Sequence, residues 1–136
     1  RDRSVSRGLG DVYKRQELIL NKMSLSTKER LAILHTLIII ANADGRRGSL
    51  ENSLLSEIAS KALCFSLEDF LGGIIEEAAL MKEEEVQTLI SNLDFQKKLM
   101  IHKLLVEMAT VDEVINEMEL KVLHYMVKMY NLPPLV

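Results

Sequence analysis

Apolar residues recur at helical spacing along most of the chain, and no stretch of any length alternates apolar and polar positions as a strand would. A first helix follows residues 26–29 and ends near residues 42–45. Apolar positions cover so much of its surface that we expect this helix to be buried on most sides. They are Leu31, Ile33, Leu34, Leu37, Ile38, Ile40 and Ala41.

Local signals place the ends of the expected helices. Residues 26–29, Ser-Thr-Lys-Glu, form a capping box, in which the serine hydroxyl and the glutamate carboxylate bond reciprocally to free backbone N–H groups. Asn116 and Glu119 form a second capping box, and Asp94 is expected to cap the helix that follows it. The prolines at 133–134 end the last helix.

The middle of the chain predicts shorter helices. Gly48 and Ser49 open one, Ser66 restarts another that the glycines at 72–73 divide into two, and residues 83–93 give one more. The positions that we expect to face the core after residue 48 are Leu50, Leu54, Leu55, Ile58, Ala62, Val86, Leu89, Ile90, Leu93, Phe95, Leu99, Leu105, Met108, Ala109, Leu120, Leu123, Val127 and Tyr130.

The segment at 37–51 repeats at 105–119 with a constant offset of 68 residues. Each copy contains an apolar helix, an alanine, an aspartate, six residues and a glutamate, followed by a further apolar helix. The acidic residues of the two copies are Asp44, Glu51, Asp112 and Glu119. Two copies are too few for a solenoid. We therefore predict an all-α fold, a compact bundle of about five to seven helices with two pseudo-symmetric helix–turn–helix repeats.

This repeat resembles the paired signature of tellurite-resistance TerB-like domains, a group that includes the DjlA N-terminal-like domains. The resemblance is carried by residues 41–45 with Glu51 and by residues 109–112 with Glu119, and it spans about residues 27–132. It implies a compact helical bundle with an acidic face made by the two motifs, and a link to tellurite and other stress phenotypes. Related domains are fused to J-domain cochaperones and to membrane-associated modules.

The resemblance also implies divalent-metal binding at the four acidic residues. The two copies differ, however, because Arg47 stands where the second copy has Ile115, and Glu113 replaces the glycine found at Gly45. A calcium-binding EF-hand is disfavoured, since its first ligand position falls on Ile40, which has no oxygen ligand to offer from its side chain.

The four carboxylates have a purely structural interpretation as well. Glu51 and Glu119 fall at the third position of their helices, where a carboxylate caps the backbone and meets the helix dipole. Asp44 and Asp112 fall where an Asx turn ends the preceding helix. Capping explains all four residues without a ligand. Metal binding at Asp44, Glu51, Asp112 and Glu119 is the alternative, and it requires that several oxygens converge.

Other residues with reactive side chains form no recognisable catalytic set. His35, His102 and His124 share no repeat position and no metal-binding spacing, so we interpret them as ordinary partly buried or surface imidazoles. Cys64 follows an apolar helix face and is expected to be a small core residue. We see no nucleophile with a neighbouring base, and we predict that the protein is not an enzyme.

Length, charge and cysteine content narrow the class of protein. The 136 residues are 48% apolar and 27% charged, which suits one globular domain. Residues 1–16 hold five of the 17 basic and two of the 20 acidic residues, leaving 12 basic and 18 acidic residues in the rest. This acidic body argues against nucleic acid as a partner. No run suits a transmembrane helix, and a single cysteine favours the cytoplasm.

The first residues look unlike the rest. Residues 6–16 resemble the translation of an adapter used to prepare sequencing libraries, and residues 17–22 read as translated upstream sequence. We therefore expect 1–22 to be a non-native, disordered leader, with Met23 as the natural start and 23–136 as the helical domain.

These observations predict a non-catalytic, cytoplasmic interaction module of the TerB-like kind in a bacterial stress response. It would offer the acidic surface of the duplicated motif to a protein partner, with a divalent cation as a further ligand to be tested. The alternative is a metal-binding sensor or metal-dependent enzyme that uses the same carboxylates. A homodimer is a third option.

Overall fold

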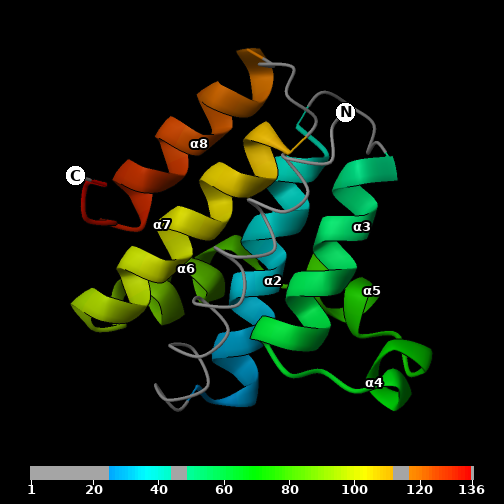
Figure 1. Cartoon of the computed structure of the whole chain (residues 1–136). Coiled ribbons are helices and arrows are strands. Elements are labelled where there is room, and N and C mark those ends of the chain that lie inside the picture. Colours follow the sequence, from blue (N-terminus) through cyan, green and yellow to red (C-terminus); the bar gives the residue numbers. More distant parts are fainter. Residues whose placement is uncertain (1–24, 44–48, 112–116, 136) are drawn as a thin grey trace.

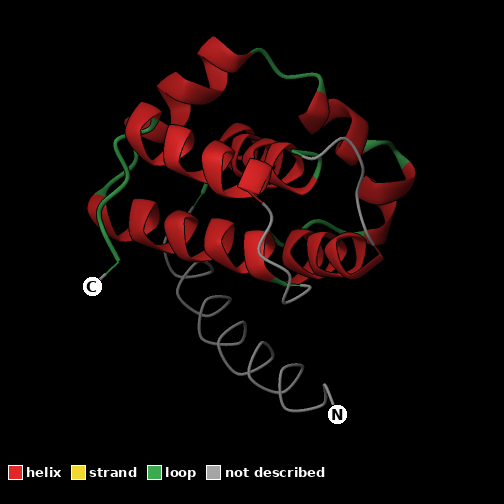
Figure 2. Ribbon diagram, turned by 90° about the horizontal axis from the view of Figure 1, so that it is seen from above, coloured by secondary structure: helices red, strands yellow, loops and turns green. Residues whose placement is uncertain are grey.

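The computed structural model describes residues 25–43, 49–111 and 117–135, which form seven α-helices and one π-helical turn, with no strand among them. The elements are α2 (Thr27–Ala41), α3 (Ser49–Glu57), η1 (Ile58–Ala62), α4 (Leu67–Leu71), α5 (Ile74–Ala79), α6 (Glu83–Ser91), α7 (Phe95–Thr110) and α8 (Glu117–Met129) (Figure 1). In Figure 2 the described parts of the chain are drawn as helices and loops, with no strand. The predicted all-α bundle is confirmed. The leader at 1–22 lies outside these residues.

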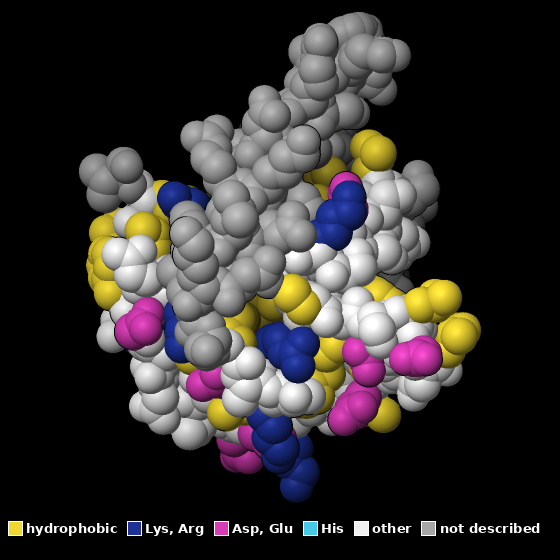
Figure 3. All heavy atoms as spheres, turned by 60° about the horizontal axis from the view of Figure 1, so that its bottom comes forward, with side chains coloured by type: hydrophobic (Ala, Val, Ile, Leu, Met, Phe, Trp, Pro, Cys, Tyr) yellow, Lys and Arg dark blue, Asp and Glu magenta, His cyan; other side chains and the backbone are white. Residues whose placement is uncertain are grey.

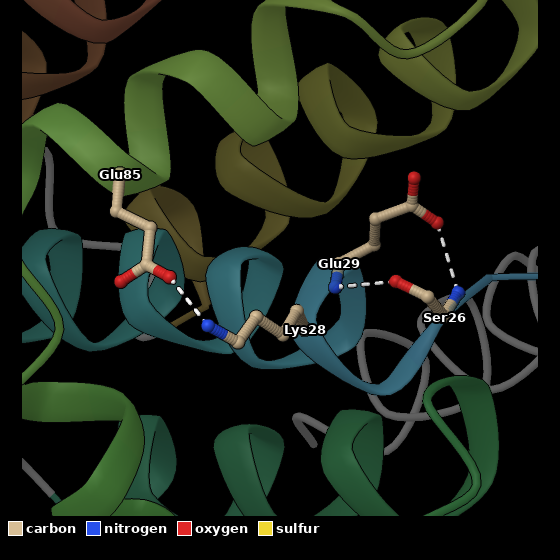
Figure 4. A network of polar contacts seen from close by, with 4 residues as sticks. All are labelled: Ser26, Lys28, Glu29 and Glu85. Atoms are coloured by element: carbon tan, nitrogen blue, oxygen red, sulfur yellow. Dashed lines mark hydrogen bonds and ion pairs between the residues drawn. The ribbon is translucent and has the colours of Figure 1, made fainter.

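Helix α2 begins at the predicted capping box. The Ser26 hydroxyl accepts a hydrogen bond from the Glu29 N–H at 3.1 Å, and the Ser26 N–H donates to the Glu29 carboxylate at 2.8 Å (Figure 4). At the second residue of the helix, Lys28 Nζ lies 2.9 Å from Glu85 Oε2 and joins α2 to α6. The local sequence thus fixes where α2 begins, and an exposed ion pair adds a contact between α2 and α6.

Helix α2 is the centre of the bundle. Ten of its 15 residues are buried, and it packs against α3, α5, α6, α7 and α8. A helix that is apolar nearly all round is stable only inside a protein, as its sequence pattern predicts. Its buried polar side chains have hydrogen-bonding partners: the Thr36 hydroxyl donates to the Ile33 carbonyl of the same helix at 2.6 Å, and His35 Nδ1 lies 2.8 Å from the Ala78 carbonyl oxygen of α5.

The remaining helices begin and end largely where the sequence predicts. Asp94 caps α7 by accepting a hydrogen bond from the Lys97 N–H at 3.0 Å. The glycines at 72–73 divide a predicted helix into α4 and α5. Gly73 has a φ of 90°, a left-handed conformation that glycine adopts without the strain a side chain would bring.

The two repeats form two helical hairpins, α2–α3 and α7–α8, that pack on each other. Helix α2 contacts α7 and α8, and α7 also contacts α3. Burial follows the sequence offset of 68 residues. Buried pairs at this offset are Ala32/Met100, Ile33/Ile101, Thr36/Leu104, Leu37/Leu105, Ile40/Met108, Ala41/Ala109, Glu51/Glu119, Leu55/Leu123 and Ile58/Met126. The predicted pseudo-symmetry is therefore seen in part of the packing of the described residues. In α2 and α3, the buried residues without a buried equivalent at this offset are Leu31, Leu34, His35, Ile38 and Leu54.

The π-helical turn η1 adds one residue to the first hairpin, so the offset falls from 68 to 67 after it. The pairs are then Leu63/Tyr130, Cys64/Asn131 and Phe65/Leu132. Cys64 and Asn131 have φ values of 62° and 55°, and such left-handed residues commonly end helices. Just after α8, the Leu132 N–H donates to the Val127 carbonyl at 3.0 Å. This hydrogen bond is typical of a helix that ends with a left-handed residue.

The sequence predicted that Cys64 would be a core residue, and this prediction is wrong. Cys64 is exposed, because the left-handed turn reverses the chain there and buries Leu63 and Phe65 on either side of it. Arg30 of α2 holds this corner in place. Its guanidinium donates to the Leu63 carbonyl at 2.9 Å and lies over the Phe65 ring, 4.9 Å from the centroid.

Two other predictions of buried side chains are wrong. Leu50 and Phe95 are exposed although their spacing matches the apolar faces of α3 and α7. Each lies at the start of its helix, at the second and first position respectively, where the neighbouring helices no longer cover the apolar face. Over the described ranges, no helix combines the length and the apolar character that a membrane crossing requires.

Candidate functional site

The duplicated acidic motif is the candidate site, and the structure describes half of its residues. Glu51 lies in the first turn of α3, and Glu119 lies in the first turn of α8. Each is the third residue of its helix, as the sequence predicts. Asp44 and Asp112 lie outside the described residues.

Both glutamates are buried: Glu51 is 5% exposed and Glu119 is 2% exposed. Each also has an interaction partner, as a buried carboxylate needs. A partner protein therefore cannot reach either side chain directly. Burial at the third helical position suits the structural interpretation, in which the carboxylate holds the start of the helix and the chain leading into it.

The two glutamates lie at the same end of the bundle. Helices α2 and α7 run in the same general direction and end at the top of Figure 1, and α3 and α8 begin there. The first turns of α3 and α8 are thus brought to one end by the packing of α2 against α7. We refer to this end, with Leu50, Glu51, Met118 and Glu119, as the hairpin end.

Exposed apolar side chains accompany the buried glutamates. Leu50 and Met118 are the second residues of α3 and α8, and both are exposed. They occupy equivalent positions in the two repeats, one residue before each glutamate. Glu117, the first residue of α8, is exposed as well. At the hairpin end, two equivalent apolar side chains are therefore exposed to solvent. The two carboxylates of the repeated motif that the structure describes are buried.

The three histidines have different surroundings, and none of them belongs to a metal-binding group among the described residues. His35 is buried against the Ala78 carbonyl, which differs from the expectation of a partly buried or surface imidazole, and His102 Nδ1 lies 2.7 Å from the Pro133 carbonyl oxygen. His124 is exposed. Within ranges 25–43, 49–111 and 117–135, no group of three or more His, Cys, Asp or Glu residues could hold a metal ion. Asp44 and Asp112 fall outside that statement.

No protein-family model, curated protein or solved structure matches the chain.

The structural interpretation of the glutamates predicts a difference between two substitutions. Glu51→Ala or Glu119→Ala should lower the free energy of unfolding by about 1–2 kcal/mol, because a buried helix cap is lost. Glu51→Gln and Glu119→Gln should lower it by less than half as much, because glutamine also serves at this position of a capping box. Urea unfolding monitored by circular dichroism measures both.

The matched control is Glu84 in the first turn of α6, which is exposed. Replacing it with Ala or Gln should change the free energy of unfolding by less than about 0.5 kcal/mol. If the glutamine variants at 51 and 119 are as unstable as the alanine variants, the negative charge itself is needed, and capping is not the main role.

Proposed function

We propose that this protein is a non-catalytic interaction module of the TerB-like kind, acting in the cytoplasm in a bacterial stress response. The hairpin end is the surface that contacts a partner protein. In this proposal Glu51 and Glu119 hold the beginnings of α3 and α8 in place, and the exposed side chains beside them make the contact.

One observation carries the proposal: two repeats that match in burial bring equivalent buried glutamates to one end of the bundle. Capping alone does not require two helix starts to lie at the same end, because each cap acts within its own helix. Burial of both carboxylates holds those helix starts rigidly, and a rigid surface loses less entropy on binding. The resemblance to TerB-like domains supports the same end as the functional one.

Exposed apolar residues at this end support binding rather than catalysis. Leu50 and Met118 lie in equivalent positions, so a partner that spans the hairpin end would contact both repeats. Methionine suits such a contact, because its flexible side chain adapts to different apolar surfaces. Glu117 adds a negative charge beside Met118, which favours a partner with basic residues at the rim of its contact surface.

Site-specific photo-cross-linking in a bacterial host tests this function. A cross-linking residue at position 50 or at position 118 should capture the same cellular protein, because both positions lie at the hairpin end. Position 88 on α6, where Thr88 is exposed, is the matched control and should not capture it. Leu50→Lys with Met118→Lys should abolish the capture and any gain in tellurite tolerance that expression of the chain confers.

Two results would contradict the proposal. One is that positions 50 and 118 capture proteins no more often than position 88 does. The other is that the double lysine variant, folded as judged by its circular dichroism, retains both the capture and the tolerance.

A divalent-metal site at the same carboxylates is the alternative function. The burial of Glu51 and Glu119 favours it, since a cation can compensate buried negative charge. Titration calorimetry with calcium, magnesium, manganese and zinc separates the two functions. The alternative predicts saturable heat and a raised melting temperature, both lost in Asp44→Ala or Asp112→Ala. The interaction module predicts neither effect at millimolar metal.

A further inference from the structure

Helix α4 contributes no buried residue to the core, yet it is well formed. It has five residues, and its start is fixed by a capping box: the Ser66 N–H donates to the Asp69 carboxylate at 2.8 Å, and the Ser66 hydroxyl accepts from the Asp69 N–H at 3.1 Å. Its leucines, Leu67 and Leu71, are 73% and 79% exposed. They lie four residues apart, so they share one face of the helix.

Helix α5 continues this exposed apolar character. Leu80, which follows its last residue, is 82% exposed, and α4 packs directly on α5. The segment 66–81 has four acidic residues and no lysine, arginine or histidine. We refer to this region as the α4–α5 surface. Its members are Leu67, Glu68, Asp69, Leu71, Glu76, Glu77 and Leu80.

Figure 3 shows the charge pattern of this region. On the right of the view, where α4 lies in Figure 1, hydrophobic side chains stand beside acidic ones. The Ser66 N–H that bonds to the Asp69 carboxylate holds the pKa of that group below its usual value. Arg30 of α2 is the basic side chain that acts on this region, because its positive charge also lowers the pKa of Asp69. Asp69 is therefore ionised at neutral pH, and the surface keeps its negative charge.

The α4–α5 surface is held in place by buried contacts beneath it. Ile74 and Ala78 of α5 are buried, Phe70 of α4 packs partly against the core, and His35 of α2 lies 2.8 Å from the Ala78 carbonyl oxygen. Gly73 supplies the left-handed turn between the two helices. The exposed leucines are thus carried on an ordered helix pair, and their exposure does not result from a loose end of the chain.

We propose that the α4–α5 surface binds a basic amphipathic helix of a partner protein. Leu67 and Leu71 lie four residues apart on α4. The partner helix presents an apolar side chain every three or four positions, so its apolar face can pack against these two leucines. The surrounding carboxylates attract lysine and arginine on its polar face and steer its approach. Exposed apolar residues rimmed by polar side chains are typical of protein-binding surfaces.

The charge decides against other occupants. A second copy of this chain would bring the same four carboxylates against its own, and a membrane with anionic lipids would repel them. The surface also differs from the hairpin end, since α4 lies at the bottom of Figure 1 and the hairpin end at the top. This inference therefore goes beyond the function proposed above and does not depend on it.

A designed peptide tests the proposal directly. The probe is a helical peptide of about 14 residues with leucines at positions i, i+3, i+4 and i+7 and lysines on the other face. Titrated into the full chain, it should shift the amide resonances of residues 66–81 in nuclear magnetic resonance spectra, with smaller shifts at the hairpin end. A peptide of the same composition in scrambled order, and one with glutamate in place of lysine, should bind at least about tenfold more weakly.

Two variants of the protein locate the contact. Leu67→Ser with Leu71→Ser should weaken peptide binding about tenfold or more, because two apolar anchors are lost. Glu68→Lys with Glu77→Lys should weaken it about fivefold at low salt and reduce its dependence on salt concentration. Both variants should melt within about 2 °C of the parent chain, since the substituted side chains are exposed. Tyr125→Ser and Glu84→Lys, at exposed positions outside both surfaces, are the matched controls and should leave binding unchanged.

Three results would overturn the proposal. The first is equal binding by the parent chain and the Leu67→Ser, Leu71→Ser variant. The second is concentration-dependent dimerisation in analytical ultracentrifugation that the same variant abolishes, which would make a second copy the occupant. The third is binding to neutral phosphatidylcholine vesicles that depends on Leu67 and Leu71, which would make a lipid surface the occupant.

Discussion

The burial of α2 is the constraint on which the rest of this structure depends. Its side chains are apolar on nearly every side, so the chain must surround it with other helices to remove that surface from water. Helices α3, α5, α6, α7 and α8 all pack on it. Because α2 and α7 are equivalent members of the two repeats, packing one on the other places both hairpins in one bundle. The first turns of α3 and α8 lie at the same end as a consequence.

Much of this architecture could be predicted from the sequence because its signals are local. The capping box at Ser26 and Glu29, the cap at Asp94 and the break at Gly73 each act within a few residues, and the structure confirms all three. The duplicated motif also predicted two pseudo-symmetric helical hairpins, and the structure pairs α2–α3 with α7–α8. The motif could not predict the π turn η1, which adds a residue to one hairpin without any change in the apolar pattern.

The predictions that failed concern tertiary surroundings. Periodicity placed Leu50 and Phe95 on apolar faces, but it does not show where neighbouring helices stop covering a face. Cys64 follows an apolar stretch and is exposed because a left-handed residue ends the helix there. In the sequence, the leucines of α4 do not differ from other apolar residues of a helix. Only the fold shows that no other element covers them. At the acidic motif, the sequence correctly placed Glu51 and Glu119 at the third helical position, whereas their depth of burial required the structure.

The bundle therefore consists of an inner scaffold, α2 with α7, and of surfaces at two ends: the hairpin end and the α4–α5 surface. Native-state amide hydrogen exchange tests this division most directly, because it measures the free energy of opening at each backbone group. We expect the central amides of α2 to exchange only through global unfolding, and those of α4, which buries no residue, to exchange many times faster. Exchange in α2 as fast as in α4 would contradict the central place of α2.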